Sequence, residues 1–185
     1  MAEQGQKRHL VLWSSAVHGG GDSSFEMAKR FHKLKYQLAW WGDSDIPSTA
    51  NKKKELRDVG ISVIDWADSA NSEGRLFADI PWQGVGALVK HAVELYGEQS
   101  IGNQVKGMDA NISSVISEWS DSPSIRKAIG EAAHKKEWYK DITRGEIVGD
   151  IVSRYLSDIA NTDLSKKISL IRKWVEADEH CEAFS

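Results

Sequence analysis

Two carboxylates stand one residue apart, directly after an apolar run that has the length of a β-strand. The run from Tyr36 to Trp41 is too short and too aromatic for a helix, and Gly42 ends it. A buried parallel strand followed by Asp43 and Asp45 places both acids at the carboxyl edge of a sheet, where open α/β folds bind ligands. Because carboxylates this close repel each other, the spacing favours a site for a hard divalent cation. The alternative is that the two acids cap the following helix.

A third acid, Glu73, follows the next predicted strand, 61–66, after a short polar loop. The carboxyl ends of neighbouring parallel strands lie at the same edge of a sheet, so we expect Glu73 to join Asp43 and Asp45 there. Together they would supply three hard oxygen donors from separate regions of the sequence. The alternative is a first-turn glutamate that interacts favourably with the helix dipole.

The elements that would position these acids alternate between strand and helix. Hydrophobic periodicity predicts a strand at 10–13, a helix at 22–34, the strand at 36–41, a helix at 48–59 and the strand at 61–66. The short connections and nearly continuous apolar strands indicate a parallel sheet with right-handed crossovers. The chain would therefore begin as an α/β domain.

A glycine-rich turn, 18–23, joins the first predicted strand to the first helix. We interpret it as a tight turn with a helix N-cap. A phosphate-binding loop is the alternative, because helix N-termini bind anions. The full dinucleotide-binding fingerprint and the Walker lysine are both missing from it, so the alternative of a small-molecule phosphotransferase has little support.

The second half of the sequence has helical periodicity throughout. Helices are predicted from Pro81 to about Tyr96, at 112–119, from Pro123 onward, at 142–159 and at 164–175. Residues 97–109 are polar, contain glycine and lack a period. We therefore expect an α/β core at 8–97 and an all-helical C-terminal part, packed on that core, at 110–180.

The composition limits the classes of partner. The formal net charge is −3 and the pI is near 6.1, so a general polyanion binder is excluded and any nucleic-acid contact must come from a local basic patch. The run Lys52–Lys54 is typical of a solvated face, with contact to a phosphate backbone as the alternative. The single cysteine, Cys181, and the lack of a long apolar run predict a cytoplasmic protein without a membrane segment.

Several motifs, taken in order, resemble a known family. They are Asp43-Ser44-Asp45 after a strand, Glu73 with the stretch 76–82, and the later segment 138–142, Trp-Tyr-Lys-Asp-Ile. This set is similar to the Toprim nuclease region of the overcoming-lysogenization-defect (OLD) family of ATP-dependent endonucleases, over residues 8–155. The resemblance implies an α/β fold with a partial Toprim-like parallel sheet flanked by helices.

The resemblance also implies a function, metal-dependent cleavage of DNA. It assigns two divalent cations, Mg²⁺ or Mn²⁺, to ligands Asp43, Asp45 and Glu73, and it places Lys140 at the scissile phosphate. Ser72, beside Glu73, is a weaker candidate. In the family an ATPase domain precedes the Toprim region, so the expected partners are DNA and an ATPase domain or subunit that is supplied separately.

One departure from the family pattern changes the expectation. The family's region begins with a strand that ends in a Glu-Gly pair, whose glutamate is a metal ligand and the expected base. Here Glu3 lies in a polar stretch with no strand before it. We therefore expect an incomplete two-metal site in a truncated or split nuclease. The rival hypothesis is a non-catalytic Toprim-like module that docks on a partner protein through its tryptophan-bearing helices. For the segment around Lys140, the alternative is that Trp138 and Tyr139 anchor two helices and the lysine stays in solvent.

Overall fold

The computed structural model describes residues 21–176, so the predicted strand at 10–13 and residues 18–20 of the glycine turn lie outside the described residues. The elements in chain order are α1 (Gly21–Lys33), β1 (Ala39–Gly42), η1 (Pro47–Thr49), α2 (Ala50–Asp58), β2 (Ser62–Asp65), α3 (Ser72–Asp79), α4 (Trp82–Tyr96), α5 (Glu98–Lys106), η2 (Ile116–Glu118), α6 (Pro123–Lys135), α7 (Ile142–Ser153) and α8 (Asp163–Glu176). The predicted mixed α/β class is confirmed, and most of the described chain is helical.

The two described strands form a parallel pair, with Trp40 opposite Val63, as the sequence predicted. β1 starts at Ala39, later than predicted, because Tyr36 takes part in the turn that closes the C-terminal end of α1. Lys35 has a left-handed backbone, with φ of 67°, and the Tyr36 N–H donates to the Phe31 carbonyl at 3.3 Å. This αL residue with a return hydrogen bond is a common helix ending.

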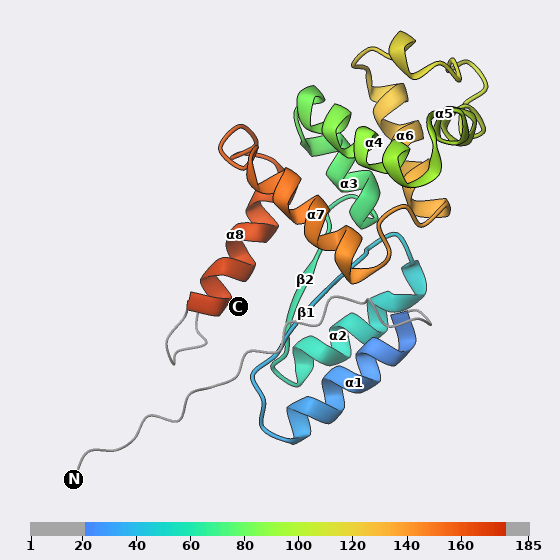
Figure 1. Cartoon of the computed structure of the whole chain (residues 1–185). Helices are drawn as coiled ribbons and strands as arrows, with labels where there is room; N and C mark the ends of the chain where they lie inside the picture. The colour runs from blue at the N-terminus through green and yellow to red at the C-terminus, as the bar shows by residue number, and fades with distance from the viewer. Residues whose placement is uncertain (1–20, 177–185) are drawn as a thin grey trace.

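The sheet separates two buried clusters. α1 and α2 lie side by side on one side of the strands, α8 lies on the other side, and α3 to α7 gather beyond the upper end of the strands (Figure 1). The smaller cluster, under α1 and α2, contains Phe25, Leu38, Trp40, Leu56 and Ile61. Because successive strand residues point to opposite faces, Trp41 instead packs edge-on against Trp66, with ring centroids 5.1 Å apart.

The larger buried cluster contains residues from both halves of the sequence. Phe77 of α3 and Trp138, which follows α6, meet there with ring centroids 6.4 Å apart and planes nearly perpendicular. Edge-to-face packing of this kind is favourable because it brings the positive edge of one ring against the negative face of the other. The helices on either side of the predicted boundary at 97–109 therefore share a core.

α3 and α6 lie antiparallel and very close together. A Cβ added at Gly130 would lie 3.0 Å from the Gly74 Cα, so glycine at both positions permits the approach. At the other end of α3, the Arg126 guanidinium donates to the carbonyls of Phe77, at 2.9 Å, and Ile80, at 2.7 Å. Arg126 thereby satisfies carbonyls that α3 leaves without an intrahelical partner.

The prediction that 97–109 is aperiodic was wrong, because Glu98–Lys106 forms α5. Ile101 and Val105 are one helical turn apart and both are fully buried. Gly102 between them weakens the local helical signal, yet it lets α5 pack directly on the backbone of Ser114. Tertiary packing stabilises a helix that its composition does not favour.

Two other helical predictions in the second half were too long. The predicted helix at 112–119 is only the short turn η2, and α7 ends at Ser153 instead of continuing to 159. Beyond α7 the chain turns tightly, with i−3 hydrogen bonds such as Asp158 N–H to the Tyr155 carbonyl at 3.0 Å. Among the helices of residues 21–176, none has the length and apolar character needed to cross a membrane.

Candidate functional site

The Asp43 carboxylate joins the end of β1 to the start of α3. Its Oδ1 accepts hydrogen bonds from the Ser72 N–H, at 2.8 Å, and from the Ser72 hydroxyl, at 2.7 Å. Beside it, the Ser44 N–H donates to the Ala70 carbonyl at 2.9 Å. These contacts bring the first predicted acid against the helix that carries the third, Glu73. A carboxylate at a helix N-terminus is also stabilised by the helix dipole.

Asp45 has an unusual environment for a carboxylate. Its Oδ1 is buried and accepts no hydrogen bond within the described part of the chain. Leaving a buried polar atom unpaired costs about 1–3 kcal/mol, and more for a charged group, so a cation beside this oxygen would be stabilising. The capping alternative was wrong for the following helices, because η1 and α2 have Ile46 and Thr49 at their N-caps and no side-chain cap hydrogen bond.

Glu73 turns its carboxylate toward α6. Its Oε2 lies 3.0 Å from His134 Nδ1, and the Glu73 side chain is only 15% exposed. Tyr139 is nearby: burial first, and then the Glu73 charge, raise the pKa of the Tyr139 hydroxyl well above its ordinary value. The hydroxyl therefore stays protonated, and it donates to the Leu88 carbonyl at 2.8 Å.

The segment that the resemblance singled out, Trp138-Tyr139-Lys140, contains two aromatics that pack inside and a lysine at the surface. Trp138 is fully buried, and its indole N–H donates to Gln104 Oε1 at 2.7 Å. Lys140 is 54% exposed, and its Nζ lies 3.1 Å from Glu137 Oε1. The helix-anchoring alternative accounts for the aromatic residues. Contact of Lys140 with a phosphate stays a prediction.

Sequence reasoning missed Lys53, which it assigned to a solvated face. Lys53 is 5% exposed, and its Nζ donates to the Asp43 carbonyl at 2.8 Å and pairs with Asp65 Oδ2 at 3.1 Å. Lys53, on α2, thus connects the residue after β1 with the last residue of β2. The signal was helical spacing, since Lys53 lies between the buried residues Thr49 and Leu56 on one helix face.

Replacing Lys53 with methionine is expected to lower the free energy of unfolding by about 2 kcal/mol. The Asp43 carbonyl and the Asp65 carboxylate would both lose their shared donor, and the partial exposure of Asp65 limits the cost. Urea denaturation measures the change. Lys54→Met, at an exposed neighbour, is the control and should leave stability within about 0.5 kcal/mol. Equal midpoints for the two variants would contradict the structural role of Lys53.

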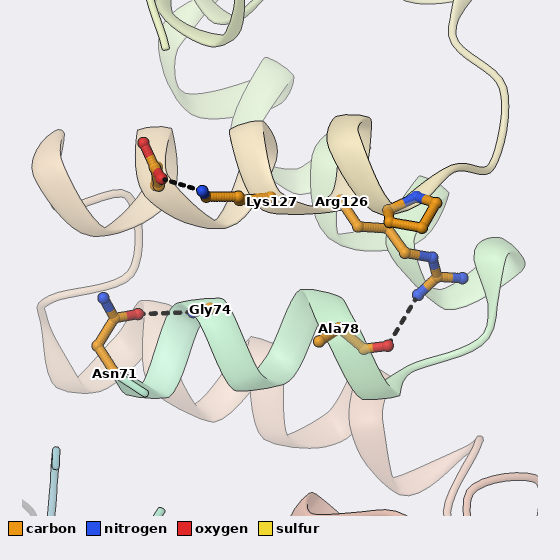
Figure 2. Close-up of a pocket in the computed structure, with 7 residues that line it drawn as sticks. Asn71, Gly74, Ala78, Arg126 and Lys127 are labelled. Atoms are coloured by element: carbon orange, nitrogen blue, oxygen red, sulfur yellow. Dashed lines mark hydrogen bonds and ion pairs between the residues drawn. The ribbon is translucent and has the colours of Figure 1, made fainter. Parts of the chain in front are cut away.

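A groove of about 370 Å³ lies between α3 and α6, and Figure 2 shows the two helices side by side along it. It is lined by Asn71, Gly74, Ala78, Pro123, Arg126, Lys127 and Glu131. Each charged side chain in it has a partner of opposite charge: Arg126 pairs with Asp121, and Lys127 lies 3.9 Å from Glu131. The groove therefore offers no unpaired charge to a ligand.

Asp43 and Asp45 carry oxygen donors of the kind that Mg²⁺ and Mn²⁺ prefer. Among the described residues, the buried Asp45 Oδ1 has no hydrogen-bond partner. Glu73 is engaged by His134 instead. Accordingly, no group of three or more His, Cys, Asp or Glu residues stands ready for a metal ion within residues 21–176.

Comparisons with known proteins found no relative of this chain. No protein-family model, no curated protein and no solved structure matches it.

Proposed function

We propose that this chain is the cation-binding Toprim-type region of an OLD-family DNA endonuclease, with an ATPase domain or subunit of that family as its partner. The observation that carries the proposal is the buried, unpaired Oδ1 of Asp45, two residues from Asp43 at the carboxyl end of a parallel pair of strands. Burying a polar oxygen without a partner is costly, and a cation beside it would offset that cost.

Each residue of the site has a distinct part in the proposal. Asp43 and Asp45 would hold Mg²⁺ or Mn²⁺, with Glu73 as the third ligand. Bound there, the cation would polarise a phosphodiester oxygen and favour attack by water. Ser72 orients the Asp43 side chain and Lys53 fixes its backbone.

In this proposal Lys140 contributes from outside the cation ligands. An ammonium group can bind a phosphate oxygen without competing with the carboxylates for the metal. Such a contact would require Lys140 to exchange Glu137 for the phosphate of the DNA, and the Lys140 side chain is 54% exposed to solvent. The pair lies at the surface, where ion pairs contribute little to stability.

The cation site predicts a clear result in calorimetry. Mn²⁺ should bind the wild-type chain, and Asp43→Asn/Asp45→Asn should weaken binding by at least about tenfold, because two charged ligands are lost. The control is Asp58→Asn/Glu98→Gln, which removes the same charge from two exposed positions. Equal heats from wild type and the Asp43/Asp45 variant would overturn the cation site.

Cleavage of supercoiled plasmid tests the nuclease part of the proposal. With Mn²⁺, we expect the purified chain to nick DNA slowly, because the family's first glutamate is missing and loss of such a group commonly costs about 10²-fold or more in rate. Asp45→Asn should abolish the slow nicking. If the wild-type chain nicks plasmid fast and Asp45→Asn abolishes this activity, the family's first glutamate is not needed for cleavage. Nicking that persists in Asp45→Asn would contradict the site.

One observation favours the rival proposal of a non-catalytic docking module. Three of the polar side chains of the proposed site have a partner inside the chain. Asp43 accepts from Ser72, Glu73 pairs with His134, and Lys140 pairs with Glu137. A module without catalysis would keep these contacts for stability alone. It would bind no Mn²⁺ at Asp43 and Asp45, so the calorimetry above separates the two proposals.

A further inference from the structure

We propose that the end of α1 and the turn after it bind single-stranded nucleic acid. We call residues 30–36 the basic turn, since its surface carries Arg30, Lys33 and Lys35, with Tyr36 beside them. The turn leads into the start of β1, so it lies at the opposite end of this strand from the candidate cation site. In Figure 1 this end of the molecule lies below the strands, away from the helices α3 to α7. The inference goes beyond the proposed function and stands on charge and exposure alone.

The cations of the basic turn have no carboxylate partner among the described residues. Arg30, Lys33 and Lys35 are exposed, and none of the three forms an ion pair within that part of the chain. Lys29, one residue before the turn, differs from them because its Nζ lies 2.5 Å from Glu55 Oε2. The positive charge of the turn is therefore available to an anionic ligand.

The way in which α1 ends holds these cations close together. The Leu34 N–H donates to the Arg30 carbonyl at 3.3 Å. The Tyr36 N–H donates to the Phe31 carbonyl at 3.3 Å, and Lys35 has a left-handed backbone, so the chain folds back over the last helical turn. The structural alternative is that the helix dipole favours cations there. That effect falls off within the last turn, and it does not require Lys35, which lies beyond α1, or an exposed aromatic ring.

Tyr36 gives the basic turn an aromatic surface. It is 44% exposed, and its ring packs edge-on against Phe31, with ring centroids 5.6 Å apart and planes at 84°. Phe31 in turn packs against the buried cluster under α1 and α2. The Tyr36 ring is thus held in place on one side, while nearly half of the residue stays open to solvent. Bases stack on such rings whatever their sequence, because every base has a π face, and neighbouring cations contact the phosphates.

The exposed ring and the unpaired cations together favour a single strand over other polyanions. In a duplex the base faces are stacked inside, so Tyr36 would find no base to bind. An anionic membrane would attract the same cations, but membrane binding also needs a broad apolar face. In the described turn, Leu34, 68% exposed, is the other exposed large apolar side chain. Because the net charge of the chain is −3, the contact must be local and strongly weakened by salt.

The test is fluorescence anisotropy of the full chain with labelled single strands of about 12 nucleotides, a length within the usual range of site sizes. EDTA is present throughout, so that no divalent cation contributes. Oligothymidylate and oligouridylate should bind alike, because phosphates and base faces are common to DNA and RNA, and a duplex of the same length should bind more weakly. Lys33→Gln/Lys35→Gln should raise Kd about tenfold in low salt and reduce the slope of log K against log salt by about 1.4, the value for two phosphate contacts.

Matched variants make the test specific to the basic turn. Lys90→Gln/Lys106→Gln removes the same charge from exposed positions of α4 and α5 and should bind like wild type. Tyr36→Ser should raise Kd about tenfold through the loss of stacking, whereas Tyr36→Phe should keep the affinity. Circular dichroism should show that each variant keeps its helices. An equal loss in Lys33→Gln/Lys35→Gln and Lys90→Gln/Lys106→Gln overturns the inference. Tighter binding of the duplex than of the single strand also overturns it, as does a wild-type chain that binds phosphatidylglycerol vesicles but no single strand.

Discussion

Replacing Trp138 with alanine is expected to lower the free energy of unfolding by about 4 kcal/mol. The indole is fully buried, and it contacts the rings of Phe77 and Tyr139 edge-on at centroid distances of 6.4 and 6.1 Å. Truncation would leave a large cavity where α3 meets the chain after α6. It would also remove the donor to Gln104, whose amide oxygen would lose its partner.

Two further variants separate burial of the ring from the hydrogen bond at its polar end. Trp138→Phe keeps much of the ring volume but lacks the N–H, and Gln104→Leu removes the acceptor and leaves a buried indole N–H unpaired. Each should cost about 1–2 kcal/mol in urea denaturation, well below the alanine variant. A Trp138→Ala chain that lost less than about 1 kcal/mol would show that the ring is not part of the core.

Replacing Gly102 with alanine is expected to cost about 3 kcal/mol, the upper end of the usual cost of overpacking. A Cβ at this position would lie 1.9 Å from the Ser114 carbonyl oxygen. The clash is with backbone, which cannot rotate away as a flexible side chain can. Relief would require α5 to move, and with it the fully buried side chains of Ile101 and Val105.

Gly86 provides the matched control for this substitution. It lies within α4, it is exposed, and nothing comes within 4 Å of a Cβ added there. Alanine should therefore raise stability by about 0.5–1 kcal/mol, because glycine loses more conformational freedom in a helix. Thermal denaturation would show opposite shifts for Gly86→Ala and Gly102→Ala. A stabilising Gly102→Ala would contradict the observed packing of α5 on Ser114.

The sequence by itself determined several of the local elements of the described chain. Pro123 predicted the start of α6, where the Ser122 hydroxyl accepts from the Ile125 N–H at 3.3 Å. The helix predicted at 48–59 corresponds to α2 and is followed by Gly60, which has a φ of +85°. Short connections and nearly continuous apolar strands predicted the parallel pairing of β1 with β2. Such signals act over a few residues, so they can be interpreted without knowing the packing.

The sequence determined the candidate site only in part. It identified Asp43, Asp45 and Glu73 as acids at one end of the sheet, because each follows a strand across a short loop. Their side-chain partners depend on residues far away in the chain: Ser72 is 29 positions from Asp43, and His134 is 61 positions from Glu73. No local pattern encodes contacts over such separations.

Only the tertiary structure decided which charges at this end of the molecule are paired. Lys53 is buried because α2 packs over both strand ends, whereas its neighbours Lys52 and Lys54 are more exposed on the same helix. Glu73 turns to His134 because α3 and α6 pack closely and antiparallel. Asp45 has a buried oxygen that accepts no hydrogen bond from the residues that the structure describes. The physical reason is that hydrogen bonding and desolvation depend on which helices meet, and that is decided by the packing of the whole core.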